Sequence, residues 1–82
     1  MKKGLQLYRI EIDSSGRIAC YCKSKKSDNE IMIPLTRSQR QLFKNYTSSN
    51  FIDDVIEEFG NPDVFHPNFT IVKNGNIVYG AE

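Results

Sequence analysis

The side chains with the greatest capacity for chemistry are two cysteines and one histidine. Cys20 and Cys22 lie two positions apart in a segment that alternates like a β-strand. Neighbours on one face of a strand are about 6.5–7 Å apart, the far limit for a disulfide, and a metal site needs more ligands than His66 can add. We therefore expect two buried thiols that act as small hydrophobic side chains. His66 has no sequence partner that would make it a catalytic base, so we expect a loop histidine.

Acidic residues crowd a short segment near the middle of the chain, namely Asp53, Asp54, Glu57 and Glu58. On a helix these form two like-charge pairs at i, i+4, each of which destabilises the helix by a few tenths of a kcal/mol. A cation site would require ligand oxygens from a second element, and the sequence offers none. The segment is either an ordinary solvated face or a docking surface for a basic partner protein.

Basic residues concentrate in the first half of the chain. Residues 1–46 hold ten basic and four acidic residues, whereas residues 47–82 hold one basic and six acidic residues. This polarity produces two oppositely charged faces if the halves fold apart, and it cancels if they interleave. The basic half could follow a phosphate backbone, although no nucleic-acid-binding motif is present. The candidate nucleic-acid-binding residues are Arg17, Tyr21, Lys23, Lys25, Lys26, Arg37 and Arg40.

The elements that position these residues begin with three strands. Residues 5–12 alternate in hydrophobicity, but Leu5 and Leu7 fall on the opposite parity from Tyr8, Ile10 and Ile12, which indicates a bulge near Leu7 or a segment covered on both faces. A turn at residues 13–16 and a return strand at 17–23 complete a hairpin. After a charged loop at 23–30, residues 31–35 form a third strand, which Pro34 restricts to a sheet edge.

Two helices are expected next. Thr36 and Ser38 each precede Gln by three positions, which fits a capping box, so a helix begins near residues 37–39. Its apolar residues face about 135° away from the following set, which is Ile52, Val55, Ile56 and Phe59. We therefore expect a break at residues 47–50 and a second helix over residues 50–59, ended by Gly60.

The chain continues through a connector at residues 61–68 to the strongest local signal, a hairpin. Residues 69–73 and 76–79 flank Asn74-Gly75, the pair preferred in a two-residue type I′ turn. Pairing across this turn places Val72 opposite Ile77 and Ile71 opposite Val78. Both faces of this hairpin are apolar, with Tyr79 on the Val72 face, so each face needs a cover.

The sequence therefore predicts one α+β domain over residues 1–82. Its order is ββ-β-α-α-ββ, with a mainly antiparallel sheet of about five strands and one or two helices packed on one face. No apolar run reaches the ~20 residues of a membrane span, and charged residues interrupt any signal-peptide core, which favours a cytoplasmic protein.

The functional expectation is a small non-enzymatic protein-interaction module. Such a module acts as a regulator, adaptor or inhibitor by occupying a partner's surface, and compact inhibitors of this size are frequent in mobile genetic elements, including anti-defence proteins. The alternative is a nucleic-acid-binding module that uses the basic half. No catalytic residue, metal or cofactor is expected, and the sequence leaves a homodimer open.

Overall fold

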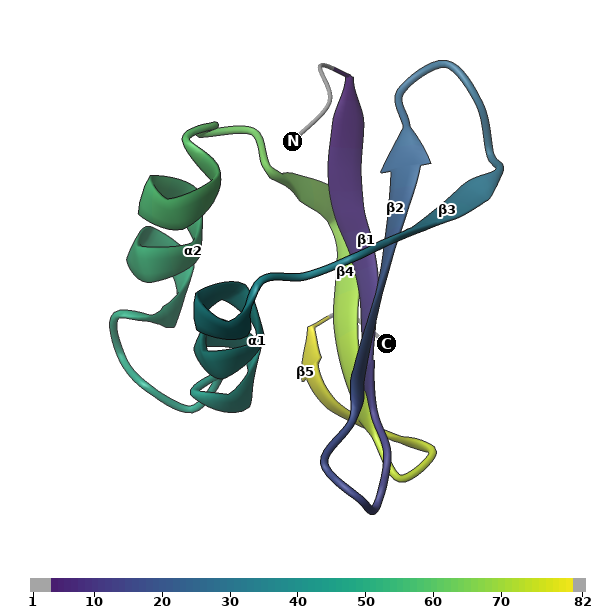
Figure 1. The fold of residues 1–82 in the computed structure, drawn as a ribbon. Coiled ribbons are helices and arrows are strands. Elements are labelled where there is room, and N and C mark those ends of the chain that lie inside the picture. The colour runs from purple at the N-terminus through teal and green to yellow at the C-terminus, as the bar shows by residue number, and fades with distance from the viewer. Residues whose placement is uncertain (1–3, 81–82) are drawn as a thin grey trace.

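A computed structural model describes residues 4–80 of the 82-residue chain (Figure 1). Five strands and two helices follow one another in the predicted order. The elements are β1 (Leu5–Ile12), β2 (Ile18–Ser24), β3 (Glu30–Ile33), α1 (Arg37–Lys44), α2 (Phe51–Phe59), β4 (Phe65–Lys73) and β5 (Asn76–Gly80). The predicted fold class is confirmed.

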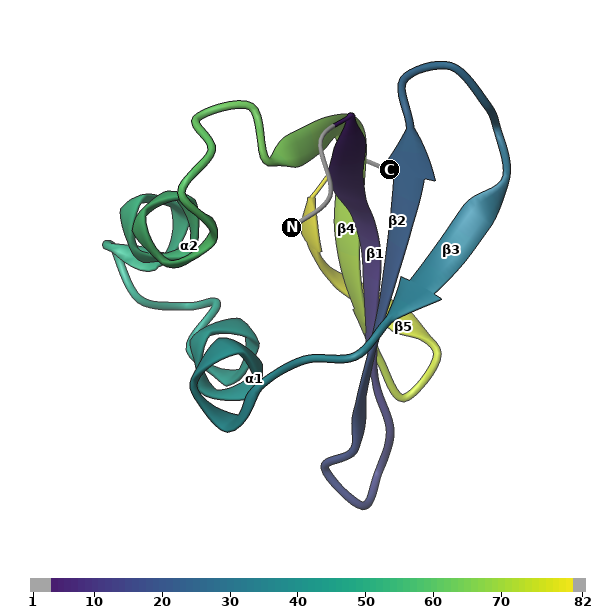
Figure 2. The same ribbon diagram turned by 45° about the horizontal axis from the view of Figure 1, so that its top comes forward.

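The strands form one sheet in the order β3-β2-β1-β4-β5, with β3 at an edge as Pro34 predicts. All neighbouring strands are antiparallel except β1 and β4, which are parallel. Both helices lie on one face of the sheet, and Figure 2 shows them nearly end-on; no helix or strand of residues 4–80 lies on the opposite side. We call that uncovered side the open face.

The bulge predicted near Leu7 is present, since the pairing of β1 with both neighbours shifts between Leu7 and Arg9. It brings Leu5 and Leu7 into the core together with Ile10 and Ile12. The expected grouping of Tyr8 with Ile10 and Ile12 is wrong, because Tyr8 is the extra residue and its ring contacts Lys23 rather than the core.

Helix α1 begins with the predicted capping box. The Thr36 hydroxyl accepts the Gln39 N–H at 3.2 Å, and the Gln39 side chain accepts the Thr36 N–H at 2.9 Å. The predicted break is also present, and Gly60 ends α2 in the left-handed conformation at φ 69°. The buried residues of α2 are Phe51 and Val55, so the expected apolar stripe is one position off at its start and Ile52 is exposed.

The core lies between the helices and the sheet, and an aromatic cluster fills its centre. The Phe43 ring packs against Phe51 and Phe59 with centroids 6.1 and 6.2 Å apart, and Phe51 also meets Tyr79 at 5.3 Å. Phe43 is the buried residue of α1, and both of these partners belong to α2, so the contact holds the two helices together.

The β4–β5 hairpin turns at Asn74 and Gly75 with φ of 52° and 81°, as the type I′ prediction requires. Val72 pairs with Ile77 as predicted, but Ile71 pairs with Tyr79 rather than Val78. A bulge in β5 inserts Val78 and turns Tyr79 inward to Phe51, so its expected place on the Val72 face is wrong.

Strand β4 begins at Phe65, four positions earlier than expected, so part of the predicted connector is strand. Phe65 pairs with Leu7 and Thr70 pairs with Arg9, which leaves an irregular stretch of β4 around Pro67 opposite the β1 bulge. Proline cannot donate to the ladder, and this irregular stretch accommodates it.

Candidate binding surfaces

The open face is built from side chains that the strand register places in lateral rows. Residues paired between neighbouring strands point to the same side of the sheet. Two rows form on this face in that way, and each crosses four strands. The first row is Met32, Tyr21, Arg9 and Thr70; the second is Ala19, Glu11, Val72 and Ile77. A hollow of about 870 Å³ lies over part of the second row and is bordered by Met32 and Arg17.

Two aromatic rings near this face carry cations over their planes. The Arg9 guanidinium lies 4.6 Å from the centre of the Tyr21 ring, and the Lys23 ammonium lies 3.9 Å from the centre of the Tyr8 ring. The Tyr8 ring also meets His66 edge-on, with centroids 5.2 Å apart. Such contacts stabilise by about 0.5–1 kcal/mol at exposed sites, and here they fix the tyrosines in place.

Arg9 is also neutralised by two carboxylates. Its Nε lies 2.8 Å from Glu11, without the alignment of a hydrogen bond, and its Nη1 lies 2.9 Å from Glu30. These partly exposed pairs contribute less than about 1 kcal/mol each. Their main consequence is that Arg9 leaves no uncompensated positive charge at the centre of the open face.

The predicted acidic docking residues all lie on α2 and all are exposed, namely Asp53, Asp54, Glu57 and Glu58. Within residues 4–80 none of them forms an ion pair, although Ser38 of α1 donates to the Glu58 carboxylate at 3.4 Å. The acidic stripe of α2 therefore lies beside α1, which carries Arg37, Arg40 and Lys44, without being neutralised by it.

The predicted nucleic-acid-binding residues do not gather in one stripe. Tyr21 and Lys23 belong to β2, while Lys25 and Lys26 lie in the turn that follows it. Arg17 precedes β2 at its opposite end. A seven-residue strand separates it from the turn with Lys25 and Lys26 by about 23 Å. There it meets Arg40 across a cavity of about 390 Å³, whereas Arg37 opens α1.

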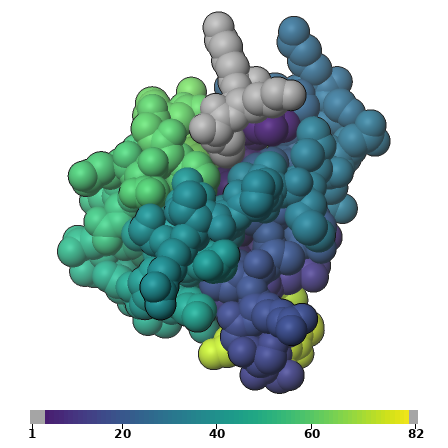
Figure 3. Space-filling model, in the orientation of Figure 1, coloured from purple at the N-terminus to yellow at the C-terminus, as the bar shows by residue number. Residues whose placement is uncertain are grey.

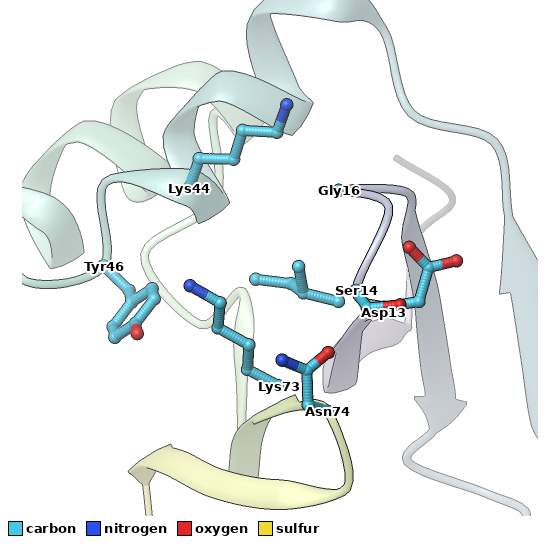
Figure 4. A pocket seen from close by; sticks show the side chains of 8 residues that line it. Asp13, Ser14, Gly16, Lys44, Tyr46, Lys73 and Asn74 are labelled. Carbon is cyan, nitrogen blue, oxygen red and sulfur yellow. The ribbon is translucent and has the colours of Figure 1, made fainter.

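Sequence reasoning missed a second, adjoining cavity of about 320 Å³ (Figure 4). Lys44 and Tyr46 approach it from α1 and the loop after it, and Lys73 and Asn74 approach it from the end of β4. Lys44 follows Arg40 by one helical turn, so its proximity to Arg40 was readable from the sequence. The position of Lys73 near these residues could not be predicted from the sequence, because it depends on how the distant hairpin joins the sheet.

The two cysteines behave as predicted. Cys20 and Cys22 of β2 are unpaired, and both are buried in the hydrophobic core. A hydrogen bond with the Cys22 thiol, together with burial, raises the pKa of the Cys20 thiol. The Cys20 thiol is therefore a poor nucleophile, because the thiolate is the reactive form. The same hydrogen bond lowers the pKa of the Cys22 thiol, but that side chain has no exposed surface. Among residues 4–80, no group of three or more His, Cys, Asp or Glu side chains could hold a metal ion.

Comparisons with protein-family models, curated proteins and solved structures found no match to this chain. Within the described residues, no helix has the length and apolar character needed to cross a membrane.

Proposed function

We propose that this chain is a small non-enzymatic protein-interaction module that acts by covering a partner protein's surface with its open face. The observation that carries the proposal is the sheet with helices on one side only. On the other side, Met32 and Ile77 are 62% and 56% exposed, and Val72 lies between the strands that carry them. Large apolar side chains on an uncovered sheet are typical of a contact surface.

The composition of the open face also supports a protein partner. Tyrosine, methionine and arginine are enriched in the buried centres of protein interfaces. Here Tyr21, Met32 and Arg9 share one lateral row, and the nearby carboxylates balance the charge of Arg9. A partly apolar centre without excess positive charge suits an apolar or aromatic partner surface better than a polyanion.

The acidic stripe on α2 is the second element of this proposal. Its four carboxylates are exposed and carry no ion pair among residues 4–80. A basic patch on the partner would find uncompensated charge there, which raises the rate and specificity of association more than the affinity. The proposed role, in the cytoplasm, is that of a regulator, adaptor or inhibitor, including an anti-defence protein of a mobile genetic element.

Nucleic-acid binding through the basic half is the alternative. Its support is the convergence of Arg17 and Arg40 on one cavity. It ranks second because base stacking needs a free aromatic face, whereas cations already cover one face of Tyr8 and of Tyr21.

Affinity capture from the native host with variant baits tests the proposal. A Met32→Glu, Ile77→Glu variant should lose a protein that the unmodified chain recovers, since both side chains are exposed and the fold should survive. Reversal of the four α2 carboxylates to Lys should weaken recovery mainly at low salt. Lys25→Glu, Lys26→Glu is the matched control, because it changes charge on an exposed turn away from both surfaces.

The outcome that contradicts the proposal is recovery of the same proteins by the open-face variant and the unmodified chain. Light scattering identifies the remaining alternative, in which a second copy covers the face. In that case the unmodified chain is a dimer and the open-face variant is a monomer.

A further inference from the structure

Two cavities adjoin at the end of the sheet where the β1–β2 turn, the end of α1 and the β4–β5 turn come together. They have volumes of about 320 and 390 Å³, and both are lined by Gly16 and Lys44. Figure 3 shows the β1–β2 turn projecting at this end, with the C-terminal hairpin behind it. We call the combined feature the basic groove; its four cations are Arg17, Arg40, Lys44 and Lys73.

The positive charge of the basic groove is not neutralised inside the described part of the chain. The ion pairs formed among residues 4–80 belong to Arg9, so none of the four groove cations takes part in one. Arg40 donates one guanidinium N–H to the Leu35 carbonyl at 3.1 Å, which anchors the side chain and leaves its other donors available.

Among residues 4–80, the carboxylate at the rim is that of Asp13, which attracts the Arg17 side chain but makes its hydrogen bonds within its own turn. It accepts hydrogen bonds from the Ser15 N–H at 2.9 Å, the Ser15 hydroxyl at 2.6 Å and the Arg17 N–H at 2.9 Å. Figure 4 shows it pointing away from Lys44 and Lys73. The groove therefore combines four cations with a carboxylate that is bound within its own turn.

We propose that the basic groove binds the phosphate group of a nucleotide, with Tyr46 beside the base. A phosphate offers several oxygens and up to two charges, which matches cations arriving from three separate elements better than a carboxylate does. Ser14 and Asn74 add neutral hydrogen-bonding groups to the wall, and Tyr46 offers a half-buried ring near Lys73. Stacking on such a ring is the usual way proteins hold a base without reading its sequence.

The size of the groove fits this ligand class. Small-molecule pockets occupy about 300–1,000 Å³, and the part lined by Lys44, Tyr46 and Lys73 has about 320 Å³. The same phosphate chemistry can come from a free nucleotide or from one nucleotide of a strand. The groove borders the open face at Arg17, but Met32 and Ile77, which carry the proposed protein interaction, do not line it, so the two proposals can fail independently.

Amide-resolved NMR titration of the full chain tests the proposal with four probes: inorganic phosphate, AMP, an oligothymidylate of about ten nucleotides and a polyglutamate peptide. Phosphate and AMP should shift the amide signals of Ser14, Gly16 and Asn74. Replacing Lys44 and Lys73 by Ala should weaken AMP binding by about tenfold for each lysine removed. The same spectra establish that each variant is folded.

Two comparisons sharpen the result. Tyr46→Leu should weaken AMP without weakening inorganic phosphate, because only the base contact is removed. Lys25→Ala, Lys26→Ala should leave both affinities unchanged, since these lysines lie at the other end of β2.

Stronger binding of the oligothymidylate than of AMP would identify a strand as the source of the phosphate, and equal binding would identify the free nucleotide. Absence of shifts around the groove with phosphate and AMP would overturn the proposal. So would preferential binding of polyglutamate, which would make the groove a site for an acidic protein.

Discussion

Replacement of Phe43 by Ala tests whether one aromatic side chain holds α1 against α2 and so completes the helical layer. Phe43 has no exposed surface, and its ring packs between Phe51 and Phe59. It is the buried residue of an eight-residue helix, which is too short to be stable alone. Removing the ring should therefore cost both the buried surface and a cavity, about 3–5 kcal/mol.

That loss is large compared with the stability of the whole domain. At about 0.05–0.15 kcal/mol per residue, 82 residues provide about 4–12 kcal/mol. Because 1 kcal/mol shifts the Tm of a domain this size by about 4–8 °C, Phe43→Ala should lower the Tm by at least about 12 °C. Urea unfolding followed by circular dichroism and by tyrosine fluorescence measures the free energy, since the chain has no Trp.

Ile52→Ala is the control, because this apolar side chain on α2 is exposed and its removal should cost about 0.5 kcal/mol or less. A loss below about 1 kcal/mol for Phe43→Ala would refute the reasoning. It would mean that α1 is not held by its aromatic contact. A large loss with two separate transitions would instead show that the helical layer unfolds before the sheet.

Three further outcomes are expected. Gly80→Ala should destabilise by about 1–3 kcal/mol in urea unfolding, because φ is +101° and a Cβ would overlap the Phe69 carbonyl oxygen; unchanged stability would contradict that geometry. Cys20 and Cys22 should resist iodoacetamide until the chain unfolds, because both are buried. The pKa of Cys20 is raised in the folded chain, so the contribution of its protonated thiol to folding stability should decline as the pH rises above about 9. Hydrogen bonds from Ser15 lower the pKa of Asp13. The contribution of the Asp13 carboxylate to folding stability should therefore be complete above about pH 4 and vanish in more acidic solution. Unfolding of Asp13→Ala and the unmodified chain at pH 7 and pH 3 measures this, and an equal difference at both pH values would contradict it.

Local signals predicted most of the secondary structure because they act between near neighbours. The capping box at Thr36 involves residues three positions apart, and the Asn74-Gly75 turn depends on two adjacent backbone conformations. The helix break at residues 47–50 followed from two apolar stripes that face different ways. Each of these features is decided within a few residues, before any tertiary contact forms.

The features that the sequence did not predict depend on distant partners. The bulge at Val78 follows from the fit of Tyr79 against Phe51, and no local pattern contains that contact. The start of β4 at Phe65 follows from its pairing with Leu7. The predicted apolar stripe on α2 began at Ile52, whereas the buried residue is Phe51. Both side chains are apolar, so only packing in the folded domain selects Phe51.

The same reasoning explains the candidate sites. Exposure of the acidic residues on α2 followed from helical spacing, so those positions were predictable. The basic groove was not, because Lys44 and Lys73 come from segments that only the sheet order brings together. The uncovered side of the sheet followed from the prediction that the helices pack on one face. The side chains that form the open face did not, because their rows depend on the register between strands.

The parallel pairing of β1 with β4 also constrains how the chain can fold as it is synthesised. Strands β1, β2 and β3 are complete early, and they can pair with one another at once. One edge of β1 then stays unpaired until β4 arrives, although Ile10 at its centre belongs opposite Ile71. An unpaired edge of an apolar strand is a template for association with other chains. A nascent chain that stalls before residue 65 therefore exposes an apolar strand edge that can pair with other chains, and the last hairpin covers this edge.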